Sequence, residues 1–258
     1  MSYKEPFNWK RKLFHLSGLI IPIIYFFNLP DIFDLRWFKD DNRSLIFYVL
    51  LILTALMLVI EYLRFKYQYW QKIFLKLLSP LLKGREEKEM QSSIHFFISC
   101  AFIIGFLPKE TAVLSVLFLS MGDPAAAYFG GRYGTVRFKN GKSLQGLLAG
   151  VGVSFLVGIL FLLTLTVNES NINNYFNDFE FRLFLYSKAG FNIKAFFICF
   201  LGAVSAFIIE LFSGKGFLDD NLTIPAGSGL VMTFLTVYFY DIAFSEVFYS
   251  LSDLLFLR

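Results

Sequence analysis

Residues 144–167 read LQGLLAGVGVSFLVGILFLLTLTV, a run of 24 residues without a charged side chain. A helix needs about 20 predominantly apolar residues to cross the hydrocarbon core of a bilayer. This run is therefore long enough for one membrane span. Similar apolar runs recur along the chain and predict seven spans, at residues 16–30, 44–62, 93–108, 111–130, 144–167, 195–213 and 222–240.

The composition of the whole chain agrees with this interpretation. Of its 258 residues, 56% are hydrophobic and 17% are charged, whereas soluble domains carry about a quarter charged residues. We therefore predict an all-α, multispanning transmembrane helical bundle in which residues 1–258 form a single integral-membrane domain. The net charge of +4 is ordinary for a membrane protein and predicts no nucleic-acid partner. Cys100 and Cys199 both fall inside apolar runs, so we interpret them as packing residues.

Basic residues divide unevenly between the two sides that seven alternating spans define. The amino terminus and residues 64–92, 129–143 and 213–220 hold 16 of the 24 lysines and arginines. The positive-inside rule then places the amino terminus in the cytoplasm and the carboxyl terminus outside.

Two segments have the pattern of amphipathic helices that lie on a membrane. In residues 64–83, large apolar side chains at helical spacing lie opposite lysines, which suits an interfacial helix against anionic lipid. Residues 244–255 repeat the pattern with acidic residues on the polar face. For both, a surface anchor is the simpler interpretation.

Half of the chain's 18 glycines lie between Gly122 and Gly158. Gly146 and Gly150 form a small-xxx-small face, which lets two helices pack closely. Asp123 is different, because a carboxylate within an apolar span is costly and by default marks a functional site. Pro124 beside it is expected to loosen the helix and free backbone groups. We predict a catalytic or metal-binding role for Asp123, with a structural hydrogen bond as the alternative.

The connector of residues 130–143 carries four basic side chains and no acidic one; these are Arg132, Arg137, Lys139 and Lys142. Gly141-Lys142-Ser143 matches the end of a P-loop, but that motif requires glycine where this chain has Val136. The same physics can still bind an anion. Backbone N–H groups and Lys142 supply positive charge, and Ser143 is predicted to cap the following helix. The alternative is that these cations only determine topology.

A second acidic cluster falls on the same predicted side. Glu210 lies near the end of the sixth predicted span, and Asp219, Asp220 and Asn221 precede the seventh. Carboxylates are hard oxygen ligands, and Mg²⁺ needs only one or two of them when phosphates and water complete its shell. We predict a metal site that combines Asp123 with Asp219 or Asp220. The alternative is that one of these two aspartates caps the next helix.

The amino-terminal segment adds Arg11 and His15, which share a helix face at the predicted cytoplasmic boundary. A single histidine at such a boundary is usually a polar anchor.

Taken in order, these motifs resemble the CTP-dependent lipid kinases, which include dolichol and polyprenol kinases, phytol kinase and CTP-dependent diacylglycerol kinase. The resemblance runs from Arg11 to Pro225. It rests on Arg11-Lys12-x-x-His15, Gly122-Asp123-Pro124-x-Ala126-Ala127 with Gly130 and Gly134, Gly141-Lys142-Ser143-x-x-Gly146, and Glu210 followed by Asp220-Asn221-Leu222-Thr223-Ile224-Pro225.

The resemblance implies an integral-membrane enzyme that uses a divalent metal (Mg²⁺ or Mn²⁺) to transfer the terminal phosphate of CTP to a lipid alcohol. It implies active-site roles for Asp123, Lys142, Asp220 and Asn221. From the residues themselves we add Arg132, Gly141 and Ser143 for phosphate binding, and Arg11 and Glu210 in support. Asp123 and His15 both remain candidates for the general base.

Two other functions fit parts of the pattern. Phosphatidate cytidylyltransferases also use CTP and a metal in the membrane, but their carboxyl-terminal signature is absent from this sequence. A transporter with a broken fourth helix is the non-enzymatic alternative. In the kinase interpretation the active site faces the cytoplasm, at the inner membrane of a bacterium or at the ER or another organelle membrane of a eukaryote.

Overall fold

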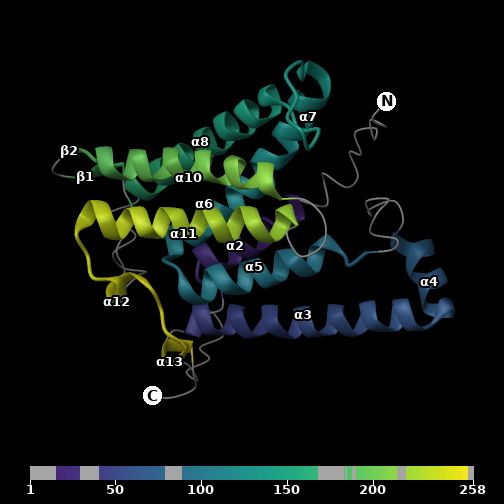
Figure 1. Ribbon diagram of the computed structural model, residues 1–258. Coiled ribbons are helices and arrows are strands. Elements are labelled where there is room, and N and C mark those ends of the chain that lie inside the picture. The colour runs from purple at the N-terminus through teal and green to yellow at the C-terminus, as the bar shows by residue number, and fades with distance from the viewer. Residues whose placement is uncertain are drawn as a thin grey trace.

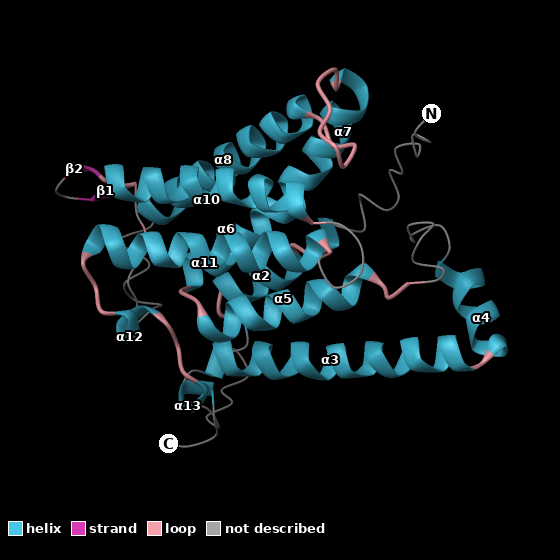
Figure 2. Ribbon diagram, viewed as in Figure 1, coloured by secondary structure: helices cyan, strands magenta, loops and turns pink. Residues whose placement is uncertain are grey.

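The computed structural model describes residues 16–29, 41–78, 89–167, 183, 185–187, 190–213 and 219–254. These residues form an all-α helical bundle with a single small β-hairpin, as Figures 1 and 2 show. In the hairpin, β1 (Tyr186–Ser187) pairs antiparallel with β2 (Gly190–Phe191). The predicted fold class is confirmed.

Five helices of the described part are long and apolar enough to cross a membrane. Four are regular: α3 (Asp41–Lys66), α8 (Leu144–Val167), α10 (Ile193–Phe212) and α11 (Asp220–Tyr240). The fifth is continuous but changes its winding from α6 (Lys109–Leu117) through the π-helix η3 (Phe118–Gly122) to α7 (Asp123–Tyr133). A shorter apolar helix, α5 (Ser92–Phe106), lies between α3 and α11.

The first predicted span, residues 16–30, contains a much shorter regular helix, α2 (Ile20–Phe26). The helix ends where Asn28 takes a positive φ of 49°. The Asn28 side chain there accepts hydrogen bonds from Asn42 at 2.6 Å and from Lys109. These long-range contacts, which hydropathy does not encode, end the helix at this point.

The two predicted interfacial segments differ from each other. The first contains α4 (Gln68–Leu78), a single amphipathic helix directly after α3. The second is divided into two single turns, α12 (Phe244–Val247) and α13 (Leu251–Leu254). Between them the backbone N–H of Tyr249 donates to the carbonyl of Phe106, so the tail is bonded to the end of α5.

The core consists of two clusters of buried apolar side chains, one around α8, α10 and α11 and the other around α3 and α5. Cys199 lies in the first and Cys100 in the second; both are fully buried and neither is in a disulfide. Their predicted role in packing is confirmed.

Glycine brings α8 close to its neighbours. A side chain at Gly146 would meet the Ala126 carbonyl and the Gly130 Cα of α7, and one at Gly150 would meet the ring of Phe207 on α10. The predicted small-residue face is therefore confirmed, and it holds the amino-terminal half of α8 between α7 and α10.

A buried arginine fastens the end of the bundle away from this contact. Arg43 of α3 is fully buried, and its Nη1 donates to the carbonyls of Ile104 at 2.6 Å and Leu107 at 2.9 Å. Its guanidinium also lies 3.4 Å from the centre of the Tyr249 ring. The last carbonyls of a helix have no partner within the helix, so Arg43 satisfies the end of α5 and holds the carboxyl-terminal tail.

Replacing Arg43 by leucine should destabilise the protein strongly. Two buried carbonyls would lose their donor, at a cost of about 3 kcal/mol or more in the free energy of unfolding. The measurement is the thermal midpoint in detergent, which should fall by several degrees. The thermal midpoint of Arg43→Lys, which keeps the charge, should fall less than that of the leucine variant. A leucine variant with the wild-type midpoint would contradict this role.

Candidate active site

Asp123 lies where the continuous helix formed by α6, η3 and α7 changes its winding. It is the first residue of α7, directly after η3, and only 9% of it is exposed. π-Helical turns are rare and often occur at functional sites. Ser154 of α8 donates to the Phe118 carbonyl at 3.2 Å, which supplies a partner within the loosened turn. The irregularity expected beside Pro124 is present, and it places a buried carboxylate at a fixed position.

Lys142 is presented by a tight turn in the connector between α7 and α8. Phe138 N donates to the Lys142 carbonyl at 2.8 Å, and Gly141 N donates to the Phe138 carbonyl at 2.9 Å. Gly141 has a φ of +85°, a conformation that side chains with a Cβ rarely adopt. At the end of the turn, Ser143 Oγ accepts from Gly146 N at 3.1 Å, so the predicted cap of the following helix is confirmed.

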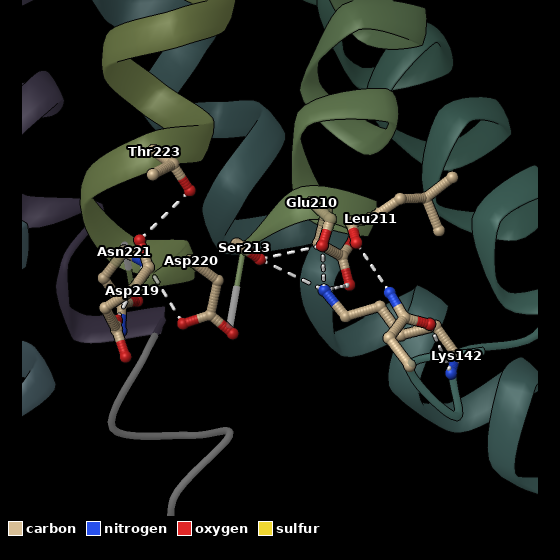
Figure 3. Close-up of polar contacts among 9 residues, drawn as sticks. Lys142, Glu210, Leu211, Ser213, Asp219, Asp220, Asn221 and Thr223 are labelled. Atoms are coloured by element: carbon tan, nitrogen blue, oxygen red, sulfur yellow. Dashed lines mark hydrogen bonds and ion pairs between the residues drawn. The ribbon is translucent and has the colours of Figure 1, made fainter. Parts of the chain in front are cut away.

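The connector is fastened to the carboxyl-terminal end of α10 (Figure 3). Lys142 Nζ donates to the Glu210 carbonyl and to Ser213 Oγ, the latter at 3.1 Å, and lies 3.2 Å from Glu210 Oε1. Asn140 Nδ2 donates to the Leu211 carbonyl at 2.6 Å. A cation is favourable at this end of a helix. Lys142 therefore has a structural role in addition to any chemical one.

Asp219, the N-cap of α11, and Asp220, its first residue, have different surroundings. Asp219 caps the helix, with its Oδ1 accepting from Asn221 N at 3.1 Å and from Asn221 Nδ2 at 2.8 Å. Ser92 of α5 donates to its other oxygen at 3.2 Å. Asp220 is partly exposed and lies between this cap and the pair formed by Glu210 and Lys142 in Figure 3.

Charges from three separate stretches of the chain meet around Glu210. Its carboxylate is attracted by Lys142 and repelled by both Asp123 and Asp220. The structure therefore brings together four of the predicted residues, which come from the start of α7, the connector, the end of α10 and the start of α11. We call these four residues, Asp123, Lys142, Glu210 and Asp220, the polar cluster.

The other predicted site residues are not part of the polar cluster. Arg132 is exposed in the last turn of α7, where it contacts Tyr128 Oη at 3.4 Å and the ring of Tyr133. Asn221 is 2% exposed and faces Asp219. Arg11 and His15 lie outside the described residues.

Three residues whose side chains bond to the site or to its connector were not predicted from the sequence: Ser92, Asn140 and Ser213. The Asn-Gly pair at residues 140 and 141 is a common turn signal and could have indicated the turn. The two serines have no such signal, because their contacts join residues 127 and 71 positions apart.

The oxygen donors of the polar cluster suit a hard cation, provided that other molecules supply the rest of its ligands. Among the residues that the structure describes, no three carboxylate, histidine or cysteine side chains converge closely enough to hold a metal ion. The carboxylates of Asp123 and Asp220 nevertheless both repel that of Glu210, and Lys142 is the one cation of the cluster, so the cluster carries excess negative charge that a cation would relieve. The residues fit a divalent ion that takes its remaining ligands from phosphates and water.

Comparisons with known proteins agree with the class that the fold defines, a multi-pass membrane protein. Over 222 residues the chain is 27% identical to an uncharacterized protein of Rickettsia prowazekii, covering 85% of this chain and 90% of that one. It is 24% identical over 228 residues to CTP-dependent diacylglycerol kinase 1 of Saccharomyces cerevisiae, covering 86% and 71%. It is 25% identical over 230 residues to the protein of the same name from Eremothecium gossypii, covering 86% and 65%.

No protein-family model matches the chain, and no solved structure matches it. The distant similarities support a relationship with CTP-dependent lipid kinases, the family that the ordered motifs resemble.

Proposed function

We propose that this protein is a membrane lipid kinase that transfers the terminal phosphate of CTP to a lipid alcohol. The observation that carries the proposal is the polar cluster, which joins Lys142 and three carboxylates at one end of an apolar bundle. Diacylglycerol is the acceptor we favour, because three similar proteins bear the name CTP-dependent diacylglycerol kinase.

Phosphoryl transfer needs mainly positioning and charge neutralisation, and each part of the site suits one of these tasks. We assign Asp123 and Asp220 to the metal ion, because Asp219 is engaged in capping α11. A bound Mg²⁺ or Mn²⁺ would neutralise charge on the nucleotide phosphates. Lys142 and the amino-terminal end of α8 would stabilise negative charge on the transferred group.

The reaction joins the hydroxyl oxygen of the lipid to the terminal phosphorus of CTP and breaks the bond from that phosphorus to the bridging oxygen. CDP leaves with the bond's electrons, and the hydroxyl proton passes to a base. Asp123 and His15 are the candidates for this base. Arg132, exposed in the last turn of α7 where the connector begins, is suited to the outer phosphates, and Arg11 remains a supporting candidate.

Position relative to the bilayer follows from the same geometry. The end of α10 and the start of α11, which hold part of the polar cluster, lie at the same end of the bundle as α4 in Figure 1, and the basic connector of residues 130–143 is bonded to this end of α10. We infer that it faces the cytoplasm, where CTP is available, and that the acceptor enters from the surrounding lipid with its hydroxyl at the interface.

The test is incubation of purified protein in lipid nanodiscs with CTP labelled at either the first or the terminal phosphate. Diacylglycerol, a polyprenol and phytol serve as acceptors, and ATP as the competing donor. We expect terminal label on diacylglycerol and release of CDP. First-phosphate label in the lipid with release of pyrophosphate would show a cytidylyltransferase instead, and absence of nucleotide consumption would favour a transporter.

A further inference from the structure

Helix α4 is joined to the end of α3 through a continuous turn. Tyr67 N donates to the Leu63 carbonyl at 2.9 Å, and Gln71 N donates to the Tyr67 carbonyl at 3.1 Å. Figure 1 shows α4 turned away from the direction of α3. Since α3 has the length and hydropathy of a membrane span, a helix turned away at its end lies near the bilayer surface.

One side of α4 packs against a buried arginine of α3. Phe74 is 8% exposed, and the Arg64 guanidinium lies 4.6 Å from the centre of its ring. Arg64 in turn pairs with Glu61 at 2.6 Å and donates to the Glu89 carbonyl at 2.8 Å. This packing fixes the rotation of α4 about its own axis.

The fixed rotation leaves an apolar strip beside a basic one. Trp70, Ile73 and Leu77 share a helix face by their spacing, yet Trp70 is 49% and Leu77 is 70% exposed. Lys72 and Lys76 lie on the other side of the helix and are both exposed. Among the described residues neither lysine takes part in a hydrogen bond or ion pair.

We propose that α4 is a docking surface for anionic lipid head groups in the leaflet next to the polar cluster. Trp70 and Leu77 enter the boundary between head groups and acyl chains, and Lys72 and Lys76 face the head groups. A helix with an apolar face and a basic polar face has this preference, and juxtamembrane lysines attract anionic lipids. Charge complementarity identifies the partner, and the proposal does not depend on the kinase reaction.

A line of contacts also leads from α4 to Asp219, the neighbour in sequence of Asp220 in the polar cluster. Arg64 contacts the Glu89 carbonyl, and three residues further on Ser92 donates to the capping Asp219. Head groups gathered at α4 therefore lie at the same end of the bundle as the polar cluster (Figure 1).

The experiment measures quenching of Trp70 fluorescence in the full chain carrying Trp9→Phe and Trp37→Phe. The vesicles contain equal parts of phosphatidylcholine and phosphatidylglycerol, with bromine on the acyl chains of one lipid or the other. We expect brominated phosphatidylglycerol to quench about twofold more than brominated phosphatidylcholine. High salt should reduce the excess, because exposed charges are screened.

Variants then assign the preference to the two lysines. Lys72→Gln/Lys76→Gln should abolish the excess, and Lys72→Arg/Lys76→Arg should keep it. Lys194→Gln, at an exposed lysine of α10, should leave it unchanged. The proposal would be overturned if the two lipids quench the parent chain equally or if neither quenches it. It would also be overturned if the excess quenching survives in Lys72→Gln/Lys76→Gln. The parent measurement decides even if a variant fails to fold.

Discussion

Replacing Asp123 by asparagine is expected to lower transfer of phosphate to the lipid by about 10²–10³-fold, the usual effect of removing one preorganised charge from an active site. Asparagine has nearly the same shape, so the packing around η3 should remain. What is lost is a charge that acts on Glu210 and, in our proposal, on the metal ion. Folding should be retained, because the substitution removes repulsion from a cluster rich in carboxylates.

The measurement is the rate of lipid phosphorylation at several Mg²⁺ concentrations, with elution volume and thermal midpoint as checks of folding. If Asp123 holds the ion, the concentration for half-maximal rate should rise as well. Asp241→Asn is a matched control, because Asp241 is exposed at the other end of α11 in a left-handed conformation that asparagine tolerates. Near-normal turnover in Asp123→Asn would remove the central assignment.

Local patterns predicted the parts of this site that depend on neighbouring residues. Asp123 stands out because a carboxylate in an apolar run is rare, and Ser143 precedes a long apolar run as a capping residue does. The small-residue face of α8 follows from the spacing of Gly146 and Gly150. Each of these features involves residues within a few turns of one helix, so the sequence displays it directly.

Contacts between distant segments could not be predicted in the same way. Lys142 meets Glu210 from 68 positions away, and Arg43 meets the end of α5 from 61 and 64 positions away. Such pairs depend on how the helices cross, which hydropathy does not specify. The same reason explains why α2 ends at Phe26, just before Asn28, and why residues 244–254 form two turns bonded to Phe106 rather than one helix.

Replacing Lys142 by methionine should also reduce turnover by about 10²–10³-fold. The same change should lower stability, and the two effects must be measured separately. An ammonium group has three N–H donors, and the Glu210 carbonyl, the Glu210 carboxylate and Ser213 occupy them all. A nucleotide phosphate must therefore take the place of one of these acceptors. The Glu210 carboxylate is the natural one to exchange, because one anion replaces another.

Loss of the ammonium would leave Glu210 beside Asp123 and Asp220 without its counter-ion, at a cost of about 2 kcal/mol in stability. Combining Lys142→Met with Glu210→Gln should restore most of that stability, because the unpaired charge is gone, yet it should leave turnover low. Lys139→Met, at an exposed lysine of the same connector, controls for the loss of a nearby positive charge and should change turnover little. If the double variant regains activity together with its thermal midpoint, Lys142 serves only to fasten α10, and phosphate must be bound by other groups.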